Sequence, residues 1–140
     1  MDQIDRRILS ILRLNARTPL KAIAEQTFLS SPAVSARIER MEQRGIILGY
    51  RAVVSHKALG RQIMAFIHLV LPPEQQKEFA AFAGQIPQIT ACYHVTGPYS
   101  MLIHVCCTDM DQLDLLVAKL QRFGTTQTQV LLSAVLPEYN

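Results

Sequence analysis

The chain has 140 residues, of which 49% are hydrophobic, and its formal net charge at pH 7 is +3. This composition is typical of a soluble globular protein with one domain or two small ones, and no apolar run approaches the ~20 residues of a membrane span. The opening MDQIDRRIL lacks the apolar segment of a signal peptide, so we expect a cytoplasmic location. The cysteines lie in apolar runs and are expected to be buried free thiols: Cys92, Cys106 and Cys107.

Positive charge is concentrated in the first part of the chain. Residues 1–60 contain ten Lys and Arg against five acidic residues, whereas residues 61–140 contain four against six. A basic first part favours a polyanionic partner such as double-stranded DNA, and the mildly acidic second part does not.

Two helices are expected in the first thirty residues. Apolar residues at helical spacing predict a helix over residues 2–15. Thr18 is expected to cap a short second helix that begins at Pro19 and ends near Gln26. Residues 27–29 then form a tight connection.

The stretch from residue 30 to residue 45 predicts a third, basic helix. Ser31 suits the N-cap, Pro32 the first helical position, and Gly45 the C-terminal stop. Apolar residues form one face, and three arginines fall on a neighbouring arc. Helix, short helix, turn and basic helix is the order of a helix-turn-helix domain, whose last helix lies in the major groove of DNA.

The cationic and hydroxyl side chains of this part are candidate DNA contacts. Arg37 and Arg40 are expected to reach guanine edges or phosphates, and Arg44 the DNA backbone. The alternative for each residue is a solvated or ion-paired side chain. The candidates are Arg17, Lys21, Ser30, Ser31, Ser35, Arg37, Arg40 and Arg44.

The middle of the chain is expected to connect two domains. Residues 46–54 predict an extended segment, and polar residues follow it. We therefore expect a helix-turn-helix domain over residues 1–50, a strand and linker over residues 51–62, and a second domain over residues 63–140.

The second domain is expected to contain four strands and two helices. Pro72 begins the first helix, and Thr108 resembles the start of a capping box for the second. The order strand-helix-strand-strand-helix-strand is the ferredoxin-like βαββαβ arrangement. The fold class is therefore α+β, a winged-helix-like helix-turn-helix domain followed by a ferredoxin-like domain. The expected strands cover residues 63–71, 89–96, 101–107 and 128–135.

Neither face of the expected sheet is clearly polar. Both helices cross one face, so the apolar opposite face needs a cover, and a second copy of the chain is the simplest one. We expect a homodimer, which would present two helix-turn-helix units to two DNA half-sites.

No catalytic or metal-binding constellation is evident in the sequence. A four-residue turn over residues 97–100 would pair His94 with Ile103 and place His94 and His104 on opposite faces of the sheet. We therefore expect no metal site and no enzyme activity.

Runs of residues at fixed spacing extend along the whole chain. Together they resemble the Lrp/AsnC family of leucine-responsive and feast/famine transcription regulators. The runs are Asp2 to Leu9, Leu12, Asn15 to Arg17, Leu29 to Pro32, Val34, Arg37-Ile38, Arg40 to Glu42, Gly45 to Ile47, Gly49-Tyr50 and Val95 to Gly97.

The resemblance implies a cytoplasmic, nucleoid-associated DNA-binding regulator built from dimers that often assemble into octamers. It also implies a second domain for effector binding and oligomerisation. A small-molecule effector, an amino acid or related metabolite, would bind between dimers, and no other cofactor is implied. Its expected contacts are Gly97, Pro98, Tyr99, Ser100 and Met101.

The chain departs from the family pattern at two turns. Phe28 stands where the family usually has glycine, and a positive φ there would cost about 1 kcal/mol. The second turn reads Gly97-Pro98-Tyr99-Ser100, whereas the family commonly has Gly-Asp-Tyr/Phe-Asp, so both acids and one amide donor are missing. An architectural protein that wraps DNA with little sequence preference and no effector is therefore the alternative function.

Overall fold

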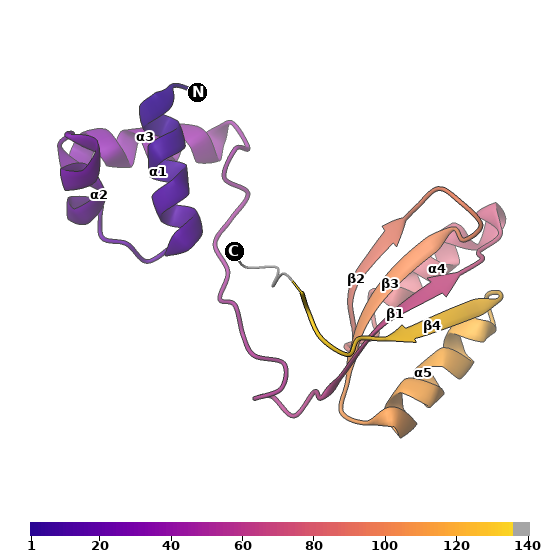
Figure 1. Cartoon of the computed structure of the whole chain (residues 1–140). Coiled ribbons are helices and arrows are strands. Elements are labelled where there is room, and N and C mark those ends of the chain that lie inside the picture. The colour runs from indigo at the N-terminus through magenta and orange to yellow at the C-terminus, as the bar shows by residue number, and fades with distance from the viewer. Residues whose placement is uncertain (136–140) are drawn as a thin grey trace. The chain divides into compact units, whose positions relative to one another are not determined.

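The chain forms two compact units, which divide between Val53 and Val54 (Figure 1). The computed structural model describes residues 1–135. We refer to residues 1–53 as the N-terminal unit and to residues 54–135 as the C-terminal unit. Each unit has its own cluster of buried apolar side chains. Within residues 1–135, every helix is too short or too polar to span a lipid bilayer.

The N-terminal unit consists of three helices, as predicted. They are α1 (Gln3–Leu14), α2 (Leu20–Thr27) and α3 (Ser31–Gln43). Ile8, Ile23 and Val34 come from the three different helices, and all three are fully buried. Because none of these short helices can bury an apolar face alone, the three stabilise one another around this shared core.

The predicted caps of α2 and α3 are wrong by one residue. Ser30, not Ser31, is the N-cap of α3, and its Oγ accepts a hydrogen bond from the Ala33 N–H at 3.3 Å. Pro32 lies at the second helical position, which it tolerates because no N–H of the first turn has a partner within the helix. Pro19, not Thr18, precedes α2, and the Thr18 hydroxyl donates instead to the Asn15 carbonyl at 2.7 Å.

Gly45 ends α3, as predicted. The Ile46 N–H donates to the Met41 carbonyl at 2.8 Å, and the Gly45 N–H donates to the Glu42 carbonyl at 2.9 Å. This pair of bonds requires a left-handed residue after the helix, and Gly45 has φ +66°. The chain therefore turns sharply away from the end of α3.

The extended segment predicted over residues 46–54 does not join a sheet, and the strand predicted within residues 51–62 is absent. Residues 44–62 contain no helix or strand, and Ile46 and Ile47 pack against the core of the N-terminal unit instead. A strand requires a neighbouring strand for its backbone hydrogen bonds, and residues 1–53 offer none. The apolar residues that suggested a strand are thus used as part of a helical core.

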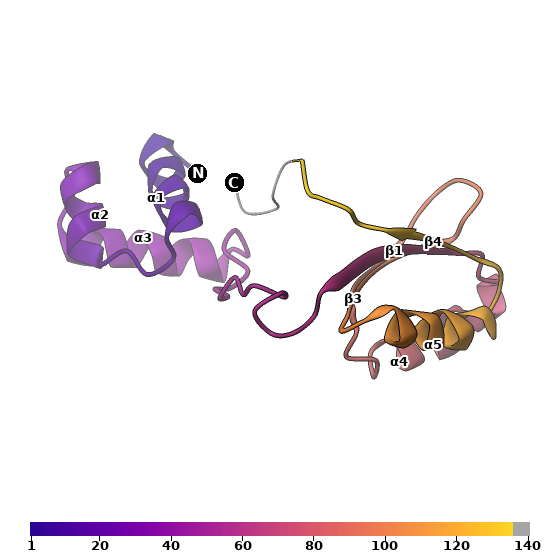
Figure 2. The same ribbon diagram turned by 60° about the horizontal axis from the view of Figure 1, so that its bottom comes forward.

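The C-terminal unit has the predicted ferredoxin-like order. Its sheet is antiparallel, with the strand order β2-β3-β1-β4, and α4 and α5 lie on the same face (Figure 2). A short 3₁₀ helix precedes α4. The elements are β1 (Ile63–Leu69), η1 (Pro73–Gln75), α4 (Gln76–Ala83), β2 (Ile89–His94), β3 (Met101–Cys107), α5 (Met110–Gln121) and β4 (Thr126–Val130).

Several predicted boundaries in this unit are wrong. Strand β1 ends two residues early, β2 ends at His94, β4 begins at Thr126, and Pro72 precedes η1 rather than beginning a helix. Asp109, not Thr108, caps α5, and its Oδ1 accepts from the Gln112 N–H at 2.8 Å. Strand β4 ends at Val130, so the predicted strand residues Leu132 and Val135 lie beyond it and are almost fully exposed. The last predicted residues of the second domain, 136–140, lie outside the described part of the chain.

The predicted turn between β2 and β3 is too short. His94 pairs with Met101 rather than with Ile103, so the loop spans residues 95–100. A shift of two residues keeps residues 91–94 on their predicted faces, so His94 and His104 face opposite sides, whereas a bulge shifts the register between Ile89 and Ala91. Residues 1–135 contain no cluster of His, Cys, Asp and Glu that could hold a metal ion.

The two faces of the sheet differ in composition. The face under α4 and α5 is a buried apolar core around Ile67, Ile103 and Phe79. The opposite face, which we call the open face, has half-buried apolar side chains on its two central strands, including Phe66 of β1 and Leu102 of β3. The predicted apolar character therefore holds for the central strands, whereas the edge strand β4 places Gln127 and Gln129 there.

Candidate nucleic-acid interface and ligand turn

Helix α3 presents most of the predicted DNA contacts. Val34 and Met41 point into the core of the N-terminal unit and fix which side of the helix is exposed. On the exposed side, the side chain of Arg40 is 52% accessible, and Arg44 is exposed at the C-cap. The structure thus leaves these two guanidinium groups accessible to solvent.

The three serines gather in the first turns of α3. Ser30 is exposed, and its Oγ is already engaged as the N-cap acceptor. Ser31 and Ser35 are half-buried, and the Ser35 hydroxyl donates to Glu39 Oε1 at 3.2 Å.

Arg37 does not lie free on the exposed side of α3. Its Nη1 donates to Asp2 Oδ2 and to Asp5 Oδ1, both at 2.7 Å, and its side chain is only 23% accessible. The guanidinium group therefore connects the middle of α3 to the first turn of α1. Arg40 Nη2 lies 3.6 Å from Asp5 Oδ1, a longer contact that leaves Arg40 largely exposed.

The two acids that hold Arg37 also cap α1. The Asp5 N–H donates to Asp2 Oδ1 at 2.8 Å, and the Asp2 N–H donates to Asp5 Oδ2 at 3.1 Å. The hydrogen bond from the Asp5 N–H, followed by that from Arg37, lowers the pKa of Asp2 below its ordinary value of 3.8. The hydrogen bond from Arg37 lowers the pKa of Asp5, and both carboxylates raise the pKa of Arg37.

This ion pair was not predicted, although the sequence contains a signal for it. An ion-paired side chain was the alternative for Arg37, but Asp2 and Asp5 were not identified as its partners. Two acids in the first turn of one helix and an arginine beside the apolar face of another are the residues such a contact needs. Asp5 is 4% exposed, which shows how closely the pair approaches the core.

Arg17 and Lys21 flank the start of α2. Both residues are exposed, and neither has an ion-pair partner in residues 1–135. The Arg17 N–H donates to Asn15 Oδ1 at 3.0 Å, which fixes the backbone of the turn while leaving the guanidinium group free to move. Both cationic side chains are thus accessible to solvent.

The predicted effector residues do not form one site within a single chain. Ser100 Oγ accepts from the Leu71 N–H and donates to the Leu71 carbonyl, both at 3.1 Å. The Tyr99 hydroxyl donates to Gln127 Oε1 at 2.7 Å, and its ring lies 5.0 Å from that of His68 on the open face. Two of the side chains expected to bind a ligand are thus used to hold the loop against the sheet.

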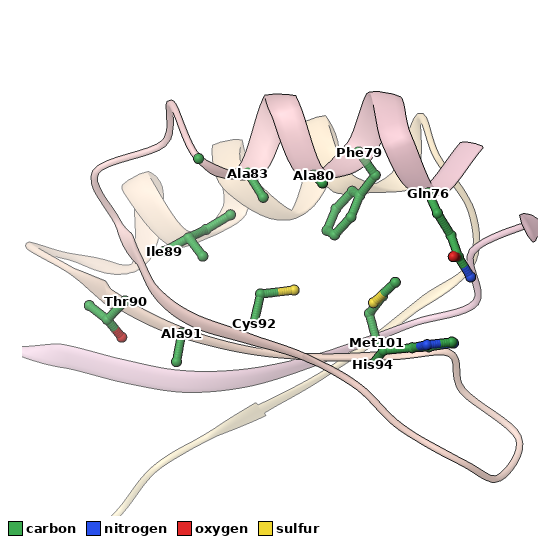
Figure 3. Close-up of a pocket in the computed structure, with 11 residues that line it drawn as sticks. Gln76, Phe79, Ala80, Ala83, Ile89, Thr90, Ala91, Cys92, His94 and Met101 are labelled. Atoms are coloured by element: carbon green, nitrogen blue, oxygen red, sulfur yellow. The ribbon is translucent and has the colours of Figure 1, made fainter. Parts of the chain in front are cut away.

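Met101 points to the other side of the sheet. It lines a cavity of about 440 Å³ between α4 and β2, together with Phe79, Ile89 and Cys92 (Figure 3). All three cysteines are free, as predicted, but Cys92 is exposed rather than buried. Burial of the sulfur still raises the pKa of Cys92, so its thiol is protonated at neutral pH.

Comparison with known proteins decides the family. Residues 1–47 match the family model described as winged helix-turn-helix DNA-binding, and residues 64–140 match the Lrp/AsnC ligand binding domain. The second match covers more than half of the chain. This chain belongs to the Lrp/AsnC family. Because its relatives are DNA-binding transcription regulators, the prediction that it is not an enzyme is confirmed.

Individual relatives resemble the chain over nearly its whole length. The regulatory protein AsnC of Escherichia coli K12 is 36% identical over 130 residues, which cover 91% of this chain and 86% of AsnC. The solved structure of E. coli AsnC has a TM-score of 0.90, is 31% identical, and covers 99% of this chain and 96% of its own. A feast or famine regulatory protein of M. tuberculosis, complexed with L-methionine, has a TM-score of 0.91 at 27% identity and covers 99% and 97% of the two chains.

Phe28 marks the first departure from the Lrp/AsnC pattern. It adopts the left-handed conformation, with φ 56° and ψ 37°, at the end of α2. The turn therefore does have a positive φ at this position, where a residue with a Cβ atom costs about 1 kcal/mol relative to glycine. The phenyl ring is 96% exposed, so packing within the chain does not compensate for this cost.

Removing the Arg37 guanidinium group should destabilise the N-terminal unit. We expect Arg37→Ala to lower the free energy of unfolding by about 2 kcal/mol, because Asp5 loses its charged hydrogen-bond donor where water scarcely reaches it. Urea unfolding followed by circular dichroism at the helix band measures the change. Arg44→Ala, which removes an exposed arginine from the same helix, is the control and should have little effect.

Acid should abolish the stability that the bonds of Asp2 and Asp5 with Arg37 provide. Since the folded-state pKa values of Asp2 and Asp5 lie below 3.8, the stability they provide is complete above that pH and is lost as the pH falls through the lowered values. The difference in unfolding free energy between the wild-type chain and Asp5→Asn should therefore shrink below a pH of about 4. A difference that stays constant on acidification would contradict this assignment.

Proposed function

We propose that this protein is a sequence-specific DNA-binding transcriptional regulator that acts as a homodimer, with octamer assembly, and responds to an amino acid or related small metabolite. Its place would be on nucleoid DNA in the cytoplasm. The observation that supports this proposal best is the basic helix α3, held by its buried face and leaving Arg40 and Arg44 accessible.

Three roles divide the DNA-binding surface. Arg40, half exposed in the middle of α3, is the candidate for contact with base edges in the major groove. Arg17, Lys21 and Arg44 are candidates for phosphate contacts, since they lie at helix ends and are exposed. The serines of the first turns of α3, Ser30, Ser31 and Ser35, would donate to phosphate or base edges. Arg37 is assigned to positioning α3 rather than to reading a base, because both of its carboxylate partners lie in the same unit.

The salt dependence of binding separates these roles. Arg17→Ala and Lys21→Ala should each weaken binding to all sequences and reduce the slope of log K against log salt by about 1. Arg40→Ala should cost about 1–3 kcal/mol on a duplex selected by the wild-type protein, with less effect on random duplex. Fluorescence anisotropy measures both, and Lys77→Ala, an exposed lysine of α4, is the control. Equal affinity of the wild-type protein for selected and random duplex would favour the architectural alternative.

The open face of the sheet supports the homodimer. Phe66 and Leu102 lie at its centre, and both belong to central strands, whereas α4 and α5 of the same unit cover the opposite face. A two-fold axis would place the same apolar centre of a second copy against it, and the glutamines of β4 would lie at the rim. The open face of each copy would then cover the open face of the other, with no other helix or strand needed between them.

Charge at the centre of the open face should prevent dimer formation. We expect Phe66→Glu to give monomers at micromolar concentration in sedimentation velocity, because a carboxylate would have to be desolvated in the interface. Gln129→Glu adds the same charge at an exposed position on the same face and should stay dimeric. A wild-type chain that sediments as a monomer, or a Phe66→Glu variant that remains dimeric, would exclude this interface.

The effector would bind at the loop between β2 and β3, between neighbouring dimers. The main-chain N–H groups of Gly97 and Tyr99 have no hydrogen-bond partner among residues 1–135, and such turn amides can bind a carboxylate. The loop offers no acid for the ammonium group of an amino acid, since Pro98 and Ser100 replace the usual pair. We therefore propose that a carboxylate is the recognised group and that free amino acids bind more weakly than they would to a loop with an acid.

Restoring one acid tests this proposal. Pro98→Asp should bind L-methionine about tenfold more tightly than Pro98→Asn, because only the aspartate can pair with the ammonium group. Both variants regain the amide donor that proline lacks, so the comparison isolates the charge. Isothermal titration calorimetry gives the two affinities. Equal affinities would place the effector elsewhere.

A further inference from the structure

We propose that Phe28 is a DNA-contact residue, whose ring packs against an apolar edge of the duplex, either a thymine methyl group or a deoxyribose. This proposal rests on the DNA binding proposed above. Phe28 connects α2 to α3 and lies two residues before Ser30, the N-cap of the helix assigned to the major groove. It therefore stands where α3 would enter the groove.

The geometry of the turn does not require phenylalanine at position 28. The N–H groups of Phe28 and Leu29 both donate to the Ala24 carbonyl, and this geometry forces residue 28 into the left-handed conformation. Phe28 is the only non-glycine residue with a positive φ in the described part of the chain. Glycine would adopt this conformation without strain. The phenyl ring is thus found at a position whose backbone conformation favours glycine.

Packing in the core of the N-terminal unit does not require phenylalanine at this position either. The neighbouring Leu29 packs against that core, whereas Phe28 is 96% exposed and belongs to no buried cluster. Strained residues of this kind persist where the strained position has a function. Contact with a partner is the remaining way in which the ring can be buried.

The surroundings of Phe28 favour DNA over another protein. Gln26 and Ser30, which lie two residues before and two residues after Phe28, are exposed and polar. The exposed ring is therefore not part of an apolar run of the kind that a protein interface needs at its centre. A single apolar side chain among polar ones matches the major groove, where thymine offers one methyl group among hydrogen-bonding edges.

Replacing Phe28 should separate folding from binding. On a duplex selected by the wild-type protein, Phe28→Gly and Phe28→Asn should bind about fivefold to tenfold more weakly, the effect of leaving an aromatic contact unmade. Their thermal midpoints should equal or exceed that of the wild-type protein, because both residues tolerate a left-handed backbone. Leu14→Ala, which truncates another exposed side chain of the same unit (86% exposed), should leave the affinity unchanged.

Two further readouts identify the contact. The slope of log K against log salt should not change in the Phe28 variants, since an apolar contact releases no counterion, whereas it falls in Arg17→Ala. Uracil in place of thymine should weaken wild-type binding and not that of Phe28→Gly if the methyl group is the partner. If the deoxyribose is the partner, uracil should have no effect on either protein.

The outcomes distinguish the two proposals. If Phe28→Gly binds the selected duplex as tightly as the wild-type protein, Phe28 is not a DNA contact, although the proposed function stands. If its salt slope falls, or if it changes the sedimentation of the free protein, the ring has another role and the inference is wrong. If the wild-type protein binds no duplex at all, both proposals fail.

Discussion

One guanidinium group held by two carboxylates determines how the helix-turn-helix unit can meet DNA. Arg37 of α3 contacts Asp2 and Asp5, which in turn cap α1, so a single cluster of charge fixes the start of one helix against the middle of another. Val34 and Met41 hold α3 by apolar contacts, and Ile38 packs beside them. Apolar contacts are not directional, whereas the ion pair is, so the ion pair adds a restraint on rotation of α3. The orientation of Arg40 and Arg44 therefore depends on a residue that does not itself reach the exposed side.

This arrangement explains why helical spacing predicted the fold better than the site. Periodicity places Val34 and Met41 inside because burial of apolar surface is not directional and depends only on the face. The same periodicity places Arg37 on an exposed arc, but it contains no information about Asp2 and Asp5, more than thirty positions away in the sequence. Cap positions failed for a related reason: Ser30 and Ser31 are both suitable caps, and the choice depends on backbone geometry that either residue could adopt.

The same contrast applies to the sheet. Runs of apolar residues predicted the strands, and the actual register at His94 differs from the predicted one by two residues, which keeps His94 and His104 on opposite faces. The sequence did not show that the Ser100 side chain bonds to both backbone groups of Leu71, while its carbonyl accepts a hydrogen bond from the Val95 N–H at 2.9 Å. The sequence around a loop serine gives no signal that its hydroxyl will bond to a distant backbone group. The expectation that Ser100 is a free ligand donor failed at that point.

Phe28 and Arg37 differ in how far the interactions of their side chains are satisfied within the folded chain. Arg37 makes two short charged bonds within its own unit, both through Nη1, whereas the Phe28 ring is almost fully exposed and is held in an unfavourable backbone conformation. A residue whose interactions are complete in the free protein gains little from a partner, and one whose interactions are absent can gain a great deal. The affinity of this unit for DNA should thus come from the residues that the folded chain leaves unsatisfied, and its geometry from those that it satisfies fully.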